Sequence, residues 1–406
     1  MSRSKKDVLR ESRRLQLLRD AALDRSVILG ERTTNSPHQT YRYPARYSPR
    51  FVSAAIELIT EPGDLILDPF VGSGTTTIEA LRHGRNSLGV DISPISTFLA
   101  RAQISNCRSR DLSLFYSWFR RRLYRCAENI ERLSLPPSMP VKNLDLQRSW
   151  RHLRLVGALL DFSREVTTLQ ERVSRQVVLK SSQWAFDVKS EIPTFGEFVE
   201  CLTDDAIHVI DACHAFSDQL TDEWGSGWRH FTSIVHNGDS AEVLRRKLLE
   251  GAEKVDAVIT SPPYPGVHVL YGRWQVYGRR ESDLPYWILG LRPTLSEGSY
   301  TMHARREPDN ATYFKSLGEV MSATRKLMRR NALMIQMVGF SKPRTQLETY
   351  IKCVSAAGFR ELKSKRLATS SDGRLWRSVP SRRWYANANV RRTATSNEVV
   401  LMFRAS

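Results

Sequence analysis

A short apolar run in the second half of the chain ends in a turn whose residue types could hold an amino group. The run "VDAVIT" is followed directly by Ser261, Pro262, Pro263 and Tyr264. Proline has a carbonyl but no N–H, and two prolines in succession restrict the turn, so Ser261 and the Pro262 carbonyl can present preorganised hydrogen-bond acceptors. Tyr264 can stack on the flat face of a base. A loop with a buried tyrosine is the structural alternative.

A glycine-rich stretch, "DPFVGSGTT" (68–76), has the composition of a ligand-binding turn between a strand and a helix. Gly72 and Gly74 allow the backbone to approach a ligand closely, with the amides of the helix start facing it. Asp91 ends the next apolar run about 20 residues later, where an acidic side chain can bind two ribose hydroxyls. These features predict a nucleoside cofactor. The patterns G-x-G-x-x-G and Gly-Lys-Ser/Thr are absent here, which disfavours a dinucleotide or a nucleoside triphosphate.

A third stretch with two interpretations is "HNGDS" (236–240), which follows another apolar run. Asn-Gly is a common hairpin-turn dipeptide, so an ordinary turn is one interpretation. The other is that Asp239 accepts a hydrogen bond from the exocyclic amine of the cofactor's base. We favour the second because the stretch precedes the Ser261 turn in the same half of the chain.

The segments around these motifs alternate between strand and helix. Residues 64–70 are expected to form a buried strand, 78–84 a helix, 86–93 a second strand and 94–105 a second helix. Strand, glycine turn, helix and strand make a βαβ unit, which predicts an α/β fold with a parallel sheet.

The middle of the chain departs from this alternation. Residues 107–230 follow a period close to 3.6, including one continuous helical stretch over 156–179, and predict an inserted helical subdomain. Strand and helix signals then resume, with a helix over 313–330, a strand over 332–340 and a last strand over 397–405.

Four regions result from this pattern. Residues 1–40 form a basic N-terminal arm with little core of its own, and residues 41–106 carry the glycine turn and Asp91. Residues 107–230 are the helical insertion and a candidate target-recognition region. Residues 231–406 contain the Ser261 turn.

The formal net charge of +18 over 406 residues narrows the class of partner. Basic residues alternate with Trp and Tyr in 119–125, 271–280 and 379–392, which suits a polyanion that also offers bases, so nucleic acid is the leading partner. A solvated basic surface is the alternative.

The cysteine pattern and the hydropathy of the chain indicate the cellular compartment. The five cysteines are scattered, with no metal-like spacing, and indicate a reducing compartment and no structural zinc. No apolar run reaches the roughly 20 residues of a membrane span, and the charged N-terminus is unlike a signal peptide. We therefore expect a cytoplasmic location.

Several motifs occur together in one consistent order. "DPFVGSGTT", "GVDIS", "NGDS" and "TSPPY", with "YPARYSPRFV" before them and "NEVVLMFRA" after, closely resemble the motifs of the S-adenosylmethionine-dependent DNA amino-methyltransferases. These enzymes methylate cytosine N4 or adenine N6. The resemblance covers residues 41–106 and 231–406 and implies a Rossmann-like class I methyltransferase fold, S-adenosylmethionine as cofactor and double-stranded DNA as partner. A companion restriction endonuclease is a further partner that this family allows.

The resemblance implies roles for residues at matching positions. Asp91 would bind the ribose and Asp239 the adenine amino group, while Ser261 to Tyr264 would form the catalytic tetrapeptide. The cofactor site would consist of Tyr47, Pro49, Asp68, Phe70, Gly72, Ser73, Gly74, Thr75, Thr76, Asp91, Ile92, Asp239 and Ser240.

In this family a first-position serine is usual for cytosine N4 enzymes, so Ser261 points to cytosine. The order of the motifs is more familiar from adenine N6 enzymes, which remain the alternative. The target base must leave the duplex to reach the pocket. Candidate DNA contacts are the arginines and aromatic residues after the catalytic turn, namely Tyr271, Arg273, Trp274, Arg279, Arg280, Arg382, Arg383 and Trp384.

Two other functions compete with DNA methylation. An RNA amino-methyltransferase, for example one acting on guanine N2 of tRNA, shares the fold and a similar D-P-P-Y turn. A DNA-binding protein that has lost activity on the same scaffold is the second alternative, which the intact motifs disfavour.

Overall fold

A mixed β-sheet forms the centre of the computed structural model, which describes residues 5–23, 36–44, 46–109, 111–135, 143–162, 166–265, 272–277, 280–291, 310–340, 342–379 and 396–406. Its strands are β1 (Leu65–Asp68), β2 (Asn86–Asp91), β3 (Ser233–Asn237), β4 (Val255–Thr260), β7 (Met328–Gly339), β8 (Phe359–Leu362), β9 (Leu375–Val379) and β10 (Ser396–Ala405). Their order is β3-β2-β1-β4-β7-β10-β8, and β9 also pairs with β10. The pairs from β3 to β7 are parallel, whereas β10 is antiparallel to its neighbours. The predicted Rossmann-like α/β fold is confirmed.

The order of the strands reverses between β1 and β4. From β1 the chain moves outward through β2 to β3, and it then returns to β4 on the other side of β1. In open α/β sheets, ligands bind beyond the carboxyl ends of the strands at such a point. The glycine turn follows β1 and the Ser261 turn follows β4, so both are placed there.

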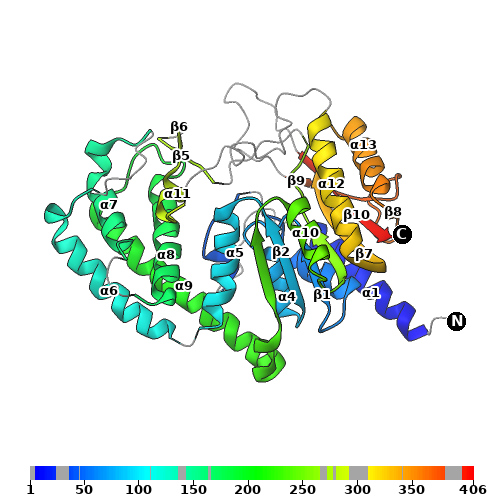
Figure 1. Cartoon of the computed structure of the whole chain (residues 1–406), viewed down its shortest axis with the longest axis horizontal. Coiled ribbons are helices and arrows are strands. Elements are labelled where there is room, and N and C mark those ends of the chain that lie inside the picture. Colours follow the sequence, from blue (N-terminus) through cyan, green and yellow to red (C-terminus); the bar gives the residue numbers. More distant parts are fainter. Residues whose placement is uncertain are drawn as a thin grey trace.

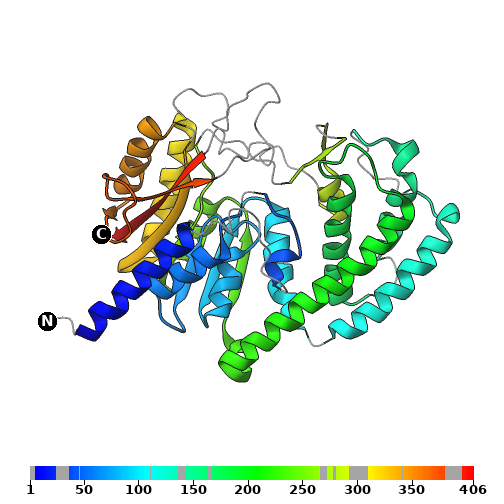
Figure 2. The same cartoon turned by 180° about the vertical axis from the view of Figure 1, so that it is seen from behind.

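Alternate residues of the strands face two helical layers. Ile66 and Ile259 pack with Phe51 on one face, whereas Leu67 and Val258 belong to the core on the other. The first face is covered by α1 (Lys5–Leu23) and α3 (Pro49–Ile59), and the second by α10 (Ser240–Leu249), α12 (Ala311–Leu327) and α13 (Pro343–Ala356) (Figures 1 and 2). This is the period of two that buries both faces of a sheet.

The N-terminal region differs from the predicted arm. Helix α1 buries Leu18 and Ala22 completely in the core that includes α3. In the turn η1 (Pro37–Gln39), His38 is buried, and its Nε2 lies 2.6 Å from Glu79 Oε1 on α4 (Thr75–Arg82). The prediction of little core is therefore wrong, because the apolar stripe of α1 outweighs its basic composition.

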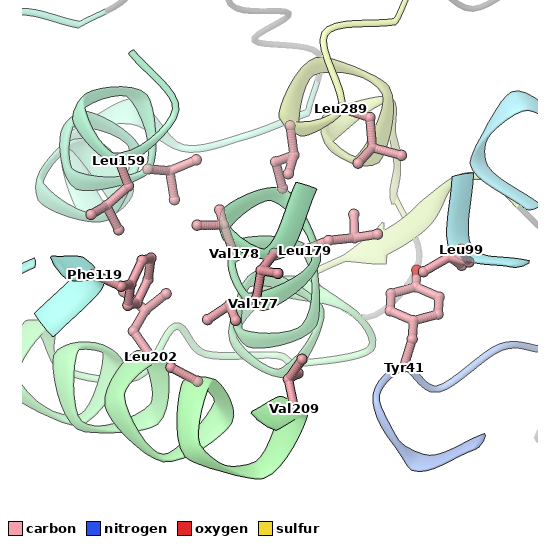
Figure 3. Packing of buried hydrophobic residues seen from close by; sticks show 14 of the residues in the cluster. Tyr41, Leu99, Phe119, Leu159, Val177, Val178, Leu179, Leu202, Val209 and Leu289 are labelled. Atoms are coloured by element: carbon pink, nitrogen blue, oxygen red, sulfur yellow. The ribbon is translucent and has the colours of Figure 1, made fainter. Parts of the chain in front are cut away.

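The helical subdomain lies beside the sheet, next to α5 (Pro94–Cys107) (Figures 1 and 2). Its helices are α6 (Leu112–Glu128), α7 (Leu146–Leu159), α8 (Thr168–Phe186) and α9 (Phe195–Trp224), with the turns η2 (Ile130–Arg132) and η3 (Gly225–His230). Figure 3 shows α8 at the centre, with Val177 and Val178 surrounded by residues of the neighbouring helices such as Phe119 and Leu202. The stretch predicted as one helix is two, because α8 starts anew at the capping box of Thr167 and Gln170.

A later segment also joins the helical subdomain. The hairpin β5 (Trp274–Val276) and β6 (Arg280–Ser282) and the helix α11 (Leu284–Ile288) bury their apolar residues in the same core as α8. Arg175 of α8 donates a hydrogen bond to the Ile288 carbonyl at 2.7 Å. The predicted boundary at residue 231 is therefore wrong for this segment.

One predicted element boundary also shifts. The helix expected to reach residue 330 ends at Leu327, and the next three residues begin β7. Met328 is already buried in the core as the first residue of that strand. Among the described helices, none combines the length and apolar composition needed to cross a membrane.

Candidate functional site

Four predicted motifs meet at the carboxyl edge of the parallel strands. The Gly72 N–H donates to Asp91 at 2.9 Å, and Ser240 Oγ donates to the Pro69 carbonyl at 2.6 Å. Thr260, at the end of β4, donates through Oγ1 to Asp68 at 2.6 Å. The structure therefore brings the glycine turn into contact with the turns after β2, β3 and β4.

The glycine turn depends on two left-handed backbone positions. Gly72 has φ 50° and Gly74 has φ 90°, a region that side chains disfavour. Gly74 is the N-cap of α4, and no side chain caps this helix. The first N–H groups of α4 therefore point toward the turn without a capping side chain as acceptor. A Cβ at Gly74 would come within 2.9 Å of Ala100 Cβ. Only glycine therefore allows this close approach of α4 and α5.

Asp68 links the glycine turn to the end of β4, directly before the Ser261 turn. Besides Thr260, its carboxylate accepts hydrogen bonds from the Phe70 N–H at 3.0 Å, Thr76 Oγ1 at 2.5 Å and the Tyr47 hydroxyl at 3.1 Å. Burial raises the pKa of Asp68, and the threonine hydrogen bonds oppose this shift. Both oxygens are engaged by the protein, so Asp68 orders the turn. Its direct contact with a cofactor stays a prediction.

The remaining predicted residues of this turn are close to Asp68 in the chain or in space. Pro49 begins α3 after Ser48, whose side chain caps that helix. Ser73, Thr75 and Thr76 are buried within the turn and the first residues of α4. The amide geometry of the turn is thus fixed from several sides before any ligand binds.

Asp91 and Ile92 lie at the end of β2, beside the glycine turn. The two carboxylate oxygens of Asp91 accept the N–H groups of Gly72 and Ser93, each at 2.9 Å. Burial raises the pKa of Asp91 to about 6, although the two amides lower it. Ile92 exposes 43% of its surface. A carboxylate followed by an exposed apolar side chain suits a nucleoside, because one can hold the ribose and the other can cover the base.

Cofactor binding is expected to weaken as the pH falls below about 6, because Asp91 then becomes protonated. Between pH 6 and pH 5 the Kd for S-adenosylmethionine should rise by up to about tenfold, the limit for one proton. Titration calorimetry measures this. Asp91→Asn cannot ionise and should bind weakly with a flat pH profile. An equally flat profile in the wild-type protein would contradict the ribose assignment.

The raised pKa of Asp91 makes the stability of the cofactor-free protein change with pH in the direction opposite to cofactor binding. The pKa of Asp91 lies above its unfolded value of 3.8. Its contribution to the free energy of unfolding is therefore fully present below that value and is lost as the pH rises through about 6. Opposite pH trends for folding and for cofactor binding would identify this carboxylate.

Asp239 and Ser240 follow β3. Asp239 is exposed and caps α10 by accepting the Glu242 N–H at 3.0 Å, while Ser240 is buried against the glycine turn. The hairpin interpretation of this stretch is wrong, because a helix begins at Ser240. The contact between Asp239 and an adenine amino group stays a prediction.

The Ser261 turn is hydrogen-bonded to β7 and to α12. Ser261 Oγ donates to the Met337 carbonyl of β7 at 2.9 Å, and the Pro263 carbonyl accepts the Tyr313 hydroxyl of α12 at 2.7 Å. Within the described part of the chain, no donor reaches the Pro262 carbonyl. Since the Ser261 hydroxyl gives its hydrogen to β7, its lone pairs are left to accept from a ligand.

The tyrosine of the turn has partners that the sequence motifs did not indicate. The Tyr264 hydroxyl donates to Glu398 Oε1 at 2.9 Å, and its ring lies against Gly339. Thr260 and Tyr313 were likewise missed. Of these residues, only Glu398 had a signal in the sequence, because it is the one acidic residue of the final strand, directly before the apolar run 399–403.

The predicted DNA contacts are only partly within the described residues. Arg280 is exposed, and Arg273 forms ion pairs with Glu281 at 3.0 Å and Asp283 at 3.2 Å. Trp274 is 3% exposed and donates to the Tyr41 hydroxyl, so the prediction of a DNA contact for Trp274 is wrong: its indole packs in the helical subdomain. Outside the described residues lie Tyr271, Arg279, Arg382, Arg383 and Trp384.

A family comparison matches the first part of this site. Residues 19–97 match the family model described as DNA methylase (N6_N4_Mtase). The matched segment contains the glycine turn and Asp91, and it ends before the helical subdomain. The Ser261 turn lies outside it.

Curated relatives match over short segments. The Type II methyltransferase M.MjaII of Methanocaldococcus jannaschii is 35% identical over 71 residues, 18% of this chain and 13% of that protein. M.MvaI of Kocuria varians is 35% identical over 96 residues, 22% of this chain and 21% of that protein. M.BsoBI of Geobacillus stearothermophilus is 48% identical over 62 residues, 15% of this chain and 12% of that protein. The matched part of this chain thus spans at most 21% of the length of these relatives.

Solved structures give a weaker likeness. The rRNA methyltransferase aviRa of Streptomyces viridochromogenes has a TM-score of 0.33 and 12% identity, covering 95% of this chain and 92% of that one. This TM-score is too low to support a conclusion about fold or function. The fold assignment rests on the order and direction of the strands.

Proposed function

We propose that the chain is a DNA amino-methyltransferase, which transfers a methyl group from S-adenosylmethionine to the exocyclic amine of a base in DNA; the match of residues 19–97 to the DNA methylase model and the similarity to Type II methyltransferases support this. The target that we propose is cytosine N4, with adenine N6 as the alternative. The proposed partner is double-stranded DNA, and a companion restriction endonuclease belongs to the same proposal.

The observation that carries the proposal is the direction of the Ser261 hydroxyl. Its hydrogen bond to the Met337 carbonyl leaves the oxygen as an acceptor. The Pro262 carbonyl is a second acceptor, since proline has no N–H to compete with it. Two fixed acceptors in one turn suit a group with two hydrogens to donate, such as a base –NH₂.

The proposed mechanism follows from the chemistry of that amine. Its lone pair is delocalised into the ring, and hydrogen bonds to Ser261 and Pro262 favour the pyramidal nitrogen, whose lone pair is available for attack. Tyr264 stacks on the ring and holds it out of the duplex. When bound, S-adenosylmethionine supplies an electrophilic methyl group on its sulfonium. The amine nitrogen would form the new N–C bond as the S–CH3 bond of the sulfonium breaks and its sulfur leaves as a neutral thioether. The methylated nitrogen would then lose its extra proton to solvent, so no covalent bond to the protein is needed.

The cofactor would occupy the edge of the sheet beside the catalytic turn. Asp91 would accept the ribose hydroxyls, Ile92 would pack on the adenine, and the amides after Gly74 would approach the methionine part. Asp68 supports this arrangement because it is hydrogen-bonded to both the cofactor turn and Thr260, the residue before the catalytic turn. The same carboxylate thus fixes the distance between the two substrates.

Transfer of label from methyl-labelled S-adenosylmethionine tests the proposal. Purified protein should label unmethylated duplex DNA and leave a matched amount of tRNA and rRNA unlabelled. Label in RNA alone would contradict DNA as the substrate and support an RNA amino-methyltransferase. Heat-denatured DNA is a useful third substrate, because it removes the cost of extracting the base.

A further inference from the structure

Three residues on neighbouring strands form a row beneath the tyrosine of the catalytic turn. Glu398 on β10 is the direct cross-strand neighbour of Gly339 on β7 and of Arg377 on β9. Direct neighbours in antiparallel strands project from the same face of the sheet. We call Gly339, Glu398 and Arg377 the cross-strand row.

The Tyr264 ring is held against this row at two places. A Cβ at position 339 would lie 2.6 Å from Tyr264 Cε2 and 2.7 Å from Cδ2, so the ring packs where only a hydrogen is present. At its other end, the hydroxyl donates to Glu398 Oε1 at 2.9 Å. One contact fixes the edge of the ring and the other fixes the hydroxyl.

The Glu398 carboxylate is itself a rigid acceptor. Its side chain is 2% exposed, and Oε2 accepts from Nε of Arg377 at 2.7 Å. Arg377 is 8% exposed and approaches Oε2 through Nη2 as well. Charge-assisted hydrogen bonds between buried partners have a strongly preferred geometry. The carboxylate therefore cannot follow the tyrosine if the ring moves.

From this arrangement we propose that Glu398 is a positioning residue for methyl transfer. It acts through Tyr264, setting the plane on which the target base stacks, while Gly339 leaves the room for the ring. This inference rests on the proposed function, because the ring must stack on a base for its plane to matter. A small misplacement of a reacting group lowers the rate of the reaction strongly.

A purely structural role for the Glu398–Arg377 pair is the competing explanation. The chain offers a matched control in Glu361, which pairs with Arg374 at 2.6 Å, each side chain being 14% exposed. Glu361 lies on β8, which also pairs with β10. Loss of either ion pair should lower the melting temperature, but only loss of Glu398 should affect Tyr264.

The experiment compares Glu398→Ala, Glu398→Gln and Glu361→Ala in the full chain. Protein labelled with [4-13C]tyrosine gives a Cζ signal for Tyr264, assigned by its absence in Tyr264→Phe, and this signal reports the hydroxyl hydrogen bond. Methyl transfer to DNA gives kcat and the KM for S-adenosylmethionine. Thermal unfolding gives stability.

Glu398→Ala should shift the Tyr264 signal and lower kcat about tenfold, or about 1.4 kcal/mol, with KM for S-adenosylmethionine unchanged. Glu398→Gln keeps an acceptor for the hydroxyl and should retain most of kcat despite losing the charge pair. Gly339→Ala, which leaves the ion pair in place, should shift the signal and lower kcat. Glu361→Ala should change stability alone.

Two results would overturn the inference. One is a shifted Tyr264 signal in Glu398→Ala with kcat unchanged. The other is a fall of kcat in all variants, Glu361→Ala included, in proportion to their stability. A wild-type protein that transfers no methyl group to DNA would contradict the proposed function instead, and the tyrosine signal would still decide whether Glu398 holds the ring.

Discussion

Replacement of Tyr264 by alanine is expected to lower kcat for methyl transfer to DNA by about a hundredfold or more. Stacking of a base on an aromatic ring contributes about 1–3 kcal/mol, and a flipped base must also offset a few kcal/mol of lost stacking in the duplex. Without the ring, the amine spends little time between the acceptors at Ser261 and Pro262. Single-turnover transfer of labelled methyl groups measures the effect.

The same substitution should leave cofactor binding intact. The Tyr264 hydroxyl donates to Glu398 on β10 and its ring lies against Gly339 on β7, whereas the glycine turn follows β1. The Kd for S-adenosylmethionine from calorimetry should therefore stay within about twofold of the wild-type value, well under the tenfold that 1.4 kcal/mol represents. Tyr264→Phe keeps the ring and should have an intermediate kcat. Loss of cofactor binding in Tyr264→Ala would mean that the roles of the two turns are misassigned.

A single methyl group at position 74 is expected to disrupt both stability and cofactor binding. Gly74 has φ 90°, and an added Cβ would meet Ala100 Cβ at 2.9 Å and Ala100 Cα at 3.0 Å. Alanine in this backbone region costs about 1–2 kcal/mol, and the overlap with α5 adds about 1–3 kcal/mol. Because this glycine is the N-cap of α4, relief of the overlap must move the first amides of α4, which we propose face the cofactor. The Kd for S-adenosylmethionine should rise at least about tenfold.

Gly63 provides the control for this prediction. It has the same φ of 90°, but an added Cβ would meet nothing within 4 Å. Gly63→Ala should therefore show the conformational cost alone in urea unfolding, with normal cofactor binding. Equal effects of the two substitutions would mean that the close approach of α4 and α5 does not shape the cofactor site.

The placement of the motifs could be predicted because parallel strands end at one edge of a sheet. Asp68, Asp91 and Ser261 each follow an apolar run, and the βαβ pattern alone implies that their turns meet. The hydrogen bonds between these turns agree with that expectation. Local signals also located the helical subdomain, whose helices have strong 3.6-residue periods.

Contacts between distant segments could not be predicted in the same way. Trp274 follows the catalytic turn in sequence and was grouped with the DNA contacts, but it is buried beside Tyr41. Glu398 lies more than a hundred residues after Tyr264, and the pairing of β7 with both β4 and β10 brings them together. The arginine-rich sequence of α1 predicts an exposed arm, because among the positions whose burial is described, residues 11–23, only Leu18 and Ala22 are buried.

The most direct test of the central claim is the identity of the methylated nucleoside. DNA labelled by the purified protein and S-adenosylmethionine is digested to nucleosides and separated with authentic standards. A first-position serine such as Ser261 is usual for cytosine N4 enzymes of the family that the chain resembles, so we predict label in N4-methylcytosine. N6-methyladenine would preserve the reaction but contradict the assignment of the base from Ser261. Label only in 5-methylcytosine, or in no nucleoside of DNA, would contradict transfer to an exocyclic amine altogether.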